Sequence, residues 1–431
     1  MIASNTVVEK NGMAILYRIL VMTSLIIFPI LQIYSLFGIN LSSLVVGSLA
    51  LVGFVFGQFK ISKRNIPHFL WIYFIYFLIV TVFSGIYNAA EMPNRVAGVL
   101  FLLVQFLLFF SCSDKESFYK IYKIVAIGTM VFFYIQEIGY NAVGLRIPGI
   151  IPFLPLDQTY ANMDAFGSFA DYLALVGRST SLFSEPAHFA QFLIPFLAMI
   201  LFWEKGILKW LLTGITVITI FRLESGNGIV GLFCVLFMYL IYQLKKGSAL
   251  ARITLISILP IIVISATLYL KDSDYSKYYG ERSSEVTMSS SSGEAHSGFY
   301  RIYRGYYVYA EYNPIEQLFG INNYYQIETR IRQSSVASLF PKGDMYFNVI
   351  QAFLIKTGLI GLLIYFLMFM ELWKGTNFCG KSILFTFAVF SFMAALHMTS
   401  NMILYFLIPY FYILERNSKQ CTYKNAGKLA N

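Results

Sequence analysis

The sequence predicts an all-α polytopic membrane protein, and three observations lead to this prediction. Of its 431 residues, 58% are hydrophobic and only 13% are charged, whereas soluble domains average about 45–50% apolar and about 25% charged residues. The chain also contains 41 Phe and 31 Tyr, which leaves too little polar side-chain surface to cover a soluble globule. Long apolar stretches recur along most of its length. A set of soluble domains is therefore excluded.

An apolar helix needs about 20 residues to cross the roughly 30 Å of hydrocarbon in a bilayer. Twelve stretches approach or reach this length, so we expect about 12 transmembrane helices. They are 15–37, 41–59, 66–87, 96–112, 121–139, 188–203, 207–221, 228–243, 253–270, 347–370, 382–399 and 402–414. The last two alternatively form one hydrophobic block with a re-entrant end.

The distribution of Lys and Arg predicts the orientation of these helices. With the N-terminus in the cytoplasm, the predicted cytoplasmic segments hold 19 of the 32 basic residues but only 6 of the 22 acidic ones. Cytoplasmic loops of membrane proteins carry this excess of Lys and Arg, so both termini are expected in the cytoplasm. Residues 1–14 lack the small-residue cleavage site of a signal peptide. The net charge of +10 is then a topology signal and does not call for nucleic acid as a partner.

Two predicted extracytoplasmic loops, 141–187 and 271–345, are much longer than the other connections. Loops beyond about 12–15 residues are usually functional or disordered. We therefore expect an N-terminal five-span bundle at 1–140, a four-span segment at 188–270 between the two loops, and C-terminal spans with a cytoplasmic tail at 346–431. Functional side chains are expected in the two long loops.

The end of the first long loop combines a cation, a carboxylate and an imidazole. Arg178, Glu185 and His188 fall within eleven residues, directly before the sixth span. Pro186 suits the first turn of a helix, with Glu185 beside the positive end of the helix dipole. Glu185 or His188 is a candidate general base. The alternative is a structural helix cap with an Arg–Glu pair, and the two interpretations remain open here.

The second long loop contains a predicted helix that ends at Asn313-Pro314. Arginine binds phosphate oxygens bidentately, and tyrosine rings are flat amphipathic surfaces suited to sugars. We therefore expect this helix to bind a diphosphate and a glycan; the alternative is an interfacial helix that lies on lipid headgroups. Its candidate binding residues are Tyr300, Arg301, Tyr303, Arg304 and Tyr307.

Weaker candidates lie in the spans themselves. Lys356 is about ten residues into the tenth span, and an ionisable residue inside a membrane is by default a functional-site hypothesis. Glu137 is its predicted partner; if the span begins later, Lys356 instead reaches the interface with its flexible side chain. His397 and Asn401, near the last predicted outer turn, either bind substrate or join neighbouring helices.

The sequence predicts no metal site and no cofactor. Asp272-Ser273-Asp274 has the spacing of the carboxylates that hold a metal in some glycosyltransferases, but a three-residue pattern in a polar stretch carries little weight. The chain contains no Walker A sequence, no GxGxxG after a strand, no HExxH and no GxSxG. Nucleotide-driven chemistry within the chain is therefore not expected.

Four stretches have a recognisable pattern. Residues 178–188 are similar to R-x-x-x-(L)-F-x-E-P before a span, and 225–228 are similar to a T/S-R-G turn, although Arg222 precedes the turn here. Residues 301–322 are similar to a run R…P…lfGvG, with Asn322 in place of the second Gly. Residues 344–361 are similar to hN…e-x-G-l-x-G, with Asn348 as the Asn.

Through these stretches the chain resembles the Wzy-type polysaccharide polymerases, integral membrane enzymes of O-antigen and capsule assembly that are related to the O-antigen ligases. Lys356 is a departure from the pattern, since that family often has an acidic or neutral residue at this position. The resemblance extends to about twelve spans with two long extracytoplasmic loops, and it implies a GT-C-like fold in the bacterial inner membrane.

The resemblance also implies a reaction. A glycan on undecaprenyl diphosphate would be transferred to the next lipid-linked repeat unit at the outer face of the membrane, with a chain-length regulator and a flippase as partners. Arg178, Arg301 and Arg304 would stabilise the leaving diphosphate, and Glu185 or His188 would serve as the base. Tyr300, Tyr303, Tyr307 and Asn348 would contact the substrate.

Two alternatives remain. An O-antigen ligase differs only in its acceptor, and its expected functional histidine in the second loop has His296 as the sole candidate. A lipid-linked oligosaccharide flippase or other transporter should place its charges within the helix bundle, with short loops on both sides. The gathering of charged and aromatic residues in two outer loops favours an extracytoplasmic glycosyltransferase.

Overall fold

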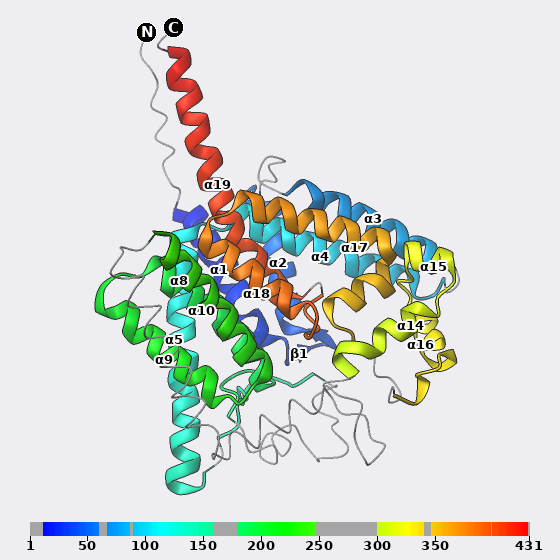
Figure 1. The fold of residues 1–431 in the computed structure, drawn as a ribbon, viewed down its shortest axis with the longest axis horizontal. Coiled ribbons are helices and arrows are strands. Elements are labelled where there is room, and N and C mark those ends of the chain that lie inside the picture. Colours follow the sequence, from blue (N-terminus) through cyan, green and yellow to red (C-terminus); the bar gives the residue numbers. More distant parts are fainter. Residues whose placement is uncertain are drawn as a thin grey trace. The chain divides into compact units, whose positions relative to one another are not determined.

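The computed structural model describes residues 12–59, 67–86, 89–145, 147–157, 179–246, 300–339, 346–397 and 399–429. The chain divides into two compact units, 1–66 with 101–189 and 67–100 with 190–431. The described residues are mostly helical, and the ribbon in Figure 1 shows the helices of each unit. The predicted span 253–270 and the pair Asp272 and Asp274 lie outside the described residues, as does His296.

The first unit is built around α1, α2 and α5, and α1 packs against both of the others. Asn40 and Asp114 cap the N-termini of α2 and α5 with their side chains, and Gly144 ends α5 with a φ of 69°. A short antiparallel ribbon of two strands joins α1 to α2. The element bounds are α1 (Gly12–Leu31), β1 (Ser35–Leu36), β2 (Ile39–Asn40), α2 (Leu41–Val55) and α5 (Lys115–Val143).

The second unit contains the other helices, and α4 and α8 contribute residues to both units. Within it α17 packs along α3, and α18 packs against α10 and α19 (Figure 1). The bounds are α3 (His68–Gly85), α4 (Met92–Cys112), α8 (Pro186–Trp203), α9 (Gly206–Arg222), α10 (Gly226–Lys246), η2 (Tyr300–Arg304), α14 (Gly305–Ala310), α15 (Pro314–Phe319), α16 (Tyr324–Gln333), η3 (Ala337–Leu339), α17 (Val349–Gly375), α18 (Phe378–Phe390) and α19 (Ser400–Leu429).

Seven of the described helices are long and apolar enough to cross a membrane: α1, α3, α4, α5, α8, α10 and α17. Shorter apolar helices are α2, α18 and the Asn401–Glu415 part of α19. Large apolar side chains on α17 are exposed at a helical spacing, at Leu359, Leu363 and Phe366, as expected for a surface that faces lipid. This architecture is that of an α-helical, membrane-embedded protein, and the total of twelve spans stays a prediction.

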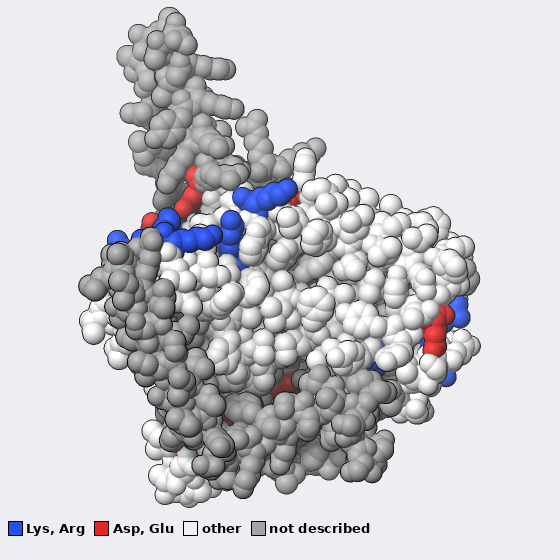
Figure 2. All heavy atoms as spheres, viewed as in Figure 1, with Lys and Arg blue, Asp and Glu red and all other residues white. Residues whose placement is uncertain are grey.

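The space-filling view is consistent with such a surface. Figure 2 shows charged side chains over α15 and α16, and again near the far end of α17, with uncharged atoms over the length of α17 between them. Along the chain, α15 carries Glu316, α16 carries Arg330, and the C-terminal part of α17 carries Glu371 and Lys374.

The predicted span 382–399 is wrong in its bounds, since the helix α18 runs from Phe378 to Phe390. The helix ends there because the carbonyl oxygens of two residues that follow it accept hydrogen bonds from another helix. The carbonyls of Ser391 and Ala394 accept hydrogen bonds from the first N–H groups of α17, at Ile350 and Val349, both at 3.1 Å. Buried backbone donors at a helix N-terminus need such partners.

The segment 300–339 is more helical than predicted. The expected helix before Asn313-Pro314 is present, but it begins with the π-helical turn η2 and continues as the short α14. Two further helices, α15 and α16, follow it. Apolar side chains attach the segment to the start of α17; they are Val308, Tyr312, Ile321, Ile327, Ile331, Phe347, Ala352 and Ile355.

Candidate functional site

The loop before α8 is held firmly against α5. Buried Ser181, at a φ of 55°, donates its N–H to Oε1 of Gln136 at 2.8 Å and its hydroxyl to the carbonyl of Thr129 at 2.7 Å. Gln136 in turn donates to the carbonyl of Ile147 at 3.0 Å. One amide side chain thus joins two stretches of the loop, and this fixes the entry of the chain into α8.

This anchored loop presents the predicted carboxylate and imidazole. Glu185 is exposed, and its carbonyl oxygen accepts the N–H of His188 at 3.1 Å, so it stands at the N-cap position of α8. The hydroxyl of Ser184 lies 2.7 Å from Nδ1 of His188, which orients the imidazole ring. Phe183 and Phe189 stack at 4.9 Å between ring centroids and close the turn.

The geometry accommodates both interpretations of this motif. Glu185 caps the helix through its backbone, and its side chain remains exposed for chemistry. Arg178 lies outside the described residues. Glu137, the predicted partner of Lys356, accepts a hydrogen bond from Ser179 at 2.6 Å. Glu137 and Ser179 belong to the first unit, whereas Lys356 belongs to the second.

The tyrosine-rich segment has one exposed face and one buried face. Tyr303 and Tyr307, four residues apart, are 41% and 45% exposed, so both rings are available to a ligand or to lipid headgroups. Burial raises the pKa of the neighbouring Tyr306 and Tyr312. The side chains of Tyr300 and Arg301 lie outside the described part.

Arg304 does not lie beside the exposed tyrosines, and its predicted role in binding a diphosphate has to be revised. Its side chain is only 2% exposed and donates to the carbonyl oxygen of Tyr346 at 3.2 Å. A π-helical turn advances the chain differently from an α-helix, which is why α-helical spacing misplaced this side chain. Arg304 connects η2 to the residues that precede α17.

Asn348 also needs revision, because its side chain is used within the protein. It is fully buried, and its Oδ1 accepts the N–H of Gln351 at 2.9 Å as the N-cap of α17. Its Nδ2 donates to the carbonyl of Phe392 at 2.9 Å. Gln351 completes a capping box and reaches the carbonyl of Ile302 at 2.8 Å. Asn348 therefore positions the end of α17.

Replacing Asn348 with Ala should destabilise the protein by about 1–2 kcal/mol, since it removes an N-cap and leaves the carbonyl of Phe392 without its donor. The thermal midpoint of unfolding in detergent measures this loss. Asn348→Asp should retain the cap but not the hydrogen bond to Phe392, and should fall between wild type and Asn348→Ala. Equal midpoints for all three proteins would contradict this assignment.

Two of the stretches that carry the family resemblance meet at a break in α17. Gly358 interrupts the helix with φ 65° and ψ −170°, and Gly320 has φ 76° and ψ −178°. The N–H of Ile321 donates to the carbonyl of Ile355 at 2.8 Å, and the hydroxyl of Tyr76 donates to the carbonyl of Thr357 at 2.9 Å. Two carbonyls beside the break thus have partners, as a membrane-embedded backbone requires.

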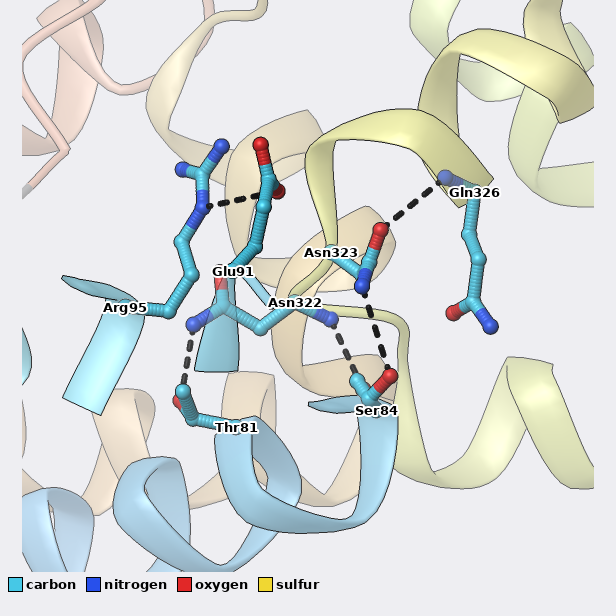
Figure 3. A network of polar contacts seen from close by, with 7 residues as sticks. All are labelled: Thr81, Ser84, Glu91, Arg95, Asn322, Asn323 and Gln326. Carbon is cyan, nitrogen blue, oxygen red and sulfur yellow. Dashed lines mark hydrogen bonds and ion pairs between the residues drawn. The ribbon is translucent and has the colours of Figure 1, made fainter. Parts of the chain in front are cut away.

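The residues after Gly320 fasten this junction to α3, as Figure 3 shows. Asn322 donates its amide to the hydroxyl of Thr81 at 2.7 Å, and its N–H to the hydroxyl of Ser84 at 3.1 Å. Asn323 reaches the carbonyl of Ser84 at 3.4 Å and caps α16 through the N–H of Gln326. Asn322, where the resembling family has Gly, therefore has a defined role in this chain.

Two basic side chains and an imidazole lie beside the junction. Arg95 lies next to Glu91, 3.7 Å from Nε to Oε2 (Figure 3). Its guanidinium stands 5.7 Å from the ring centroid of Tyr324. Lys356 lies two residues before the break, where Gly320 packs against its backbone, and the ring of His397 meets that of Phe353, one helical turn before Lys356. We call the basic side chains of Arg95 and Lys356, together with the imidazole of His397, the cationic cluster.

The ring of His397 is fixed by its surroundings. Its Nε2 lies 3.3 Å from the hydroxyl of Tyr73, and its ring meets the ring of Phe353 edge-on at 4.5 Å between centroids. Lys356, His397 and Arg95 are each only partly buried. The structure thus joins Lys356 and His397, which the sequence left as separate weak candidates, and adds Arg95, which sequence reasoning missed as a site residue.

No family model and no curated protein matches this chain. Within the part of the chain that the structure describes, no group of three or more His, Cys, Asp or Glu residues is arranged to hold a metal ion. The functional assignment therefore depends on the residues of the two candidate regions, the α8 entrance and the cationic cluster.

Proposed function

We propose that the chain is a polysaccharide polymerase, which transfers a glycan from undecaprenyl diphosphate to the next lipid-linked repeat unit. One observation supports it most directly: an anchored loop presents the carboxylate of Glu185 and the oriented imidazole of His188 at the start of a membrane-length helix. A base at this place would meet a substrate that is itself held in the membrane.

In the proposed reaction a hydroxyl of the acceptor sugar attacks the anomeric carbon of the donor glycan. A new glycosidic bond forms as the bond from that carbon to the diphosphate oxygen breaks, and undecaprenyl diphosphate leaves with the electron pair. Glu185 or His188 takes the hydroxyl proton. Arg178 and Arg301 are proposed to stabilise the charge on the leaving group. Buried Arg304 is no longer assigned to it.

The proposal includes a place in the cell. The chain would lie in the bacterial inner membrane with both termini in the cytoplasm and its active site at the outer face. A flippase and a chain-length regulator of the same pathway would be its partners. An O-antigen ligase would use the same groups with a different acceptor.

A transporter of lipid-linked oligosaccharides is the second candidate, and one observation favours it. Discontinuous membrane helices with a charged residue beside the break are found at the binding sites of many transporters, and α17 has such a break beside Lys356. In this chain, groups outside α17 donate hydrogen bonds to the carbonyls beside the break. The same hydrogen bonds would also keep a binding scaffold rigid, so they do not by themselves indicate a transporter.

The test uses the purified protein in lipid vesicles with an undecaprenyl-diphosphate oligosaccharide, a chelator and no nucleotide. A polymerase should produce a ladder of lengthening lipid-linked glycans when products are separated by size. Arg178→Ala should abolish the ladder, whereas Arg416→Ala, in the predicted cytoplasmic tail, should not. A single transfer to an added lipid A core would indicate a ligase. Movement of intact substrate across the bilayer without any product would indicate a transporter.

A further inference from the structure

The cationic cluster carries more positive charge than the described residues around it neutralise. Arg95 and Lys356 are two basic side chains, and Glu91 is the carboxylate beside Arg95. Among the described residues no carboxylate forms an ion pair with Lys356. Two like charges held together in partly buried surroundings cost free energy unless an anion joins them. An arrangement of this kind is therefore expected where an anion binds.

The three groups come from different elements. Arg95 comes from the start of α4, Lys356 from the turn before the break in α17, and His397 from the connection between α18 and α19. Asn322 and Ile321 tie the intervening loop to α3 and α17, and Tyr73 orients His397. Side chains with such contacts, here His397 and Arg95, lose little entropy when a ligand binds.

The position of the cluster indicates how an anion would arrive. Both α4 and α17 are long and apolar enough to cross a membrane, and Leu359 and Leu363, just after the break, are exposed apolar side chains on α17. A ligand with a charged head and an apolar tail would match this neighbourhood. Arginine and lysine together, with a donor imidazole, suit the several oxygens of a diphosphate.

We propose that Arg95, Lys356 and His397 form a binding site for the diphosphate group of a membrane-held isoprenoid ester. The site was not among the groups assigned to the diphosphate from the sequence, and it replaces the buried Arg304 in that role. The inference rests on the proposed function only for the lipid source of the ligand; the anion site itself follows from the cluster.

The experiment measures binding to the full chain in lipid nanodiscs, with farnesyl diphosphate, inorganic pyrophosphate and farnesol as probes. Wild type should bind farnesyl diphosphate and not farnesol. Lys356→Met and Arg95→Gln should each weaken this binding about tenfold or more, since each removes a charge-assisted contact. Lys374→Met, on the same helix near its other end, and Arg332→Gln, on α16, are matched controls and should bind as wild type does.

Further variants separate a lost contact from a lost fold. Lys356→Arg keeps the charge and should retain binding; if it binds no better than Lys356→Met while both proteins remain monodisperse, the site is wrong. Equal affinities for pyrophosphate and farnesyl diphosphate would mean that the site recognises the anion alone. A higher affinity for farnesyl diphosphate would mean that it also recognises the isoprenoid chain. Wild-type affinity in the double variant Arg95→Gln/Lys356→Met would overturn the proposal.

The binding measurement is independent of glycan transfer. A chain that binds farnesyl diphosphate through the cationic cluster but forms no glycan ladder would retain the site and refute the polymerase. A chain that forms the ladder, and still does so at the wild-type rate as the double variant, would retain the polymerase and refute the site.

Discussion

Replacement of Gly358 with Ala should leave little or no folded protein. Gly358 has backbone angles that only glycine adopts readily, and occupying them costs another residue about 1–3 kcal/mol. A Cβ on Gly358 would also lie 2.3 Å from the carbonyl oxygen of Leu318, so the junction between the two segments would have to open. Together these effects exceed about 4 kcal/mol, which is exceptional for one substitution.

Size-exclusion profiles and the thermal midpoint in detergent would measure this loss, and Gly320→Ala should behave in the same way. The matched control is Gly214→Ala, within α9, where an added Cβ meets no atom within 4 Å. In a helix interior this change should be neutral or stabilising by roughly 0.5–1 kcal/mol. If Gly358→Ala unfolded at the same temperature as Gly214→Ala, the break in α17 would not be a structural requirement.

Glu185→Gln should reduce glycan transfer by about 10²- to 10⁴-fold, the usual contribution of a general base. The amide has nearly the shape of the carboxylate but takes up no proton at neutral pH. Because the side chain is exposed and α8 is capped through the backbone of residue 185, the variant should keep its thermal stability. The rate of ladder formation in vesicles, measured beside the thermal midpoint, separates chemistry from folding.

Glu204→Gln is the matched control because Glu204 follows the other end of α8, and its transfer rate should equal that of wild type. Full activity of Glu185→Gln would refute the assignment of this carboxylate as the base. In that event His188→Gln becomes the decisive variant, since His188 is oriented by Ser184 at 2.7 Å and is the other group assigned to the proton.

The sequence by itself determined the class of the protein and much of its secondary structure. Apolar stretches of membrane length predict helices because a backbone in lipid has to satisfy its own hydrogen bonds, and each predicted span within the described residues overlaps a helix. The start of a helix at Pro186 was also predicted from the local sequence, since Pro suits the first turn of a helix.

Only the tertiary structure decided which polar residues lie together. Arg95, Lys356 and His397 are far apart in the sequence, and their proximity depends on the contact between residues 318–322 and the break at Gly358. Local sequence patterns do not predict this contact. The two glycines need a positive φ only because the two segments pack against each other, and that packing is not visible in the sequence. The inward turn of Arg304 has the same origin: a π-helical turn and the carbonyl of Tyr346, not helical periodicity, set its direction.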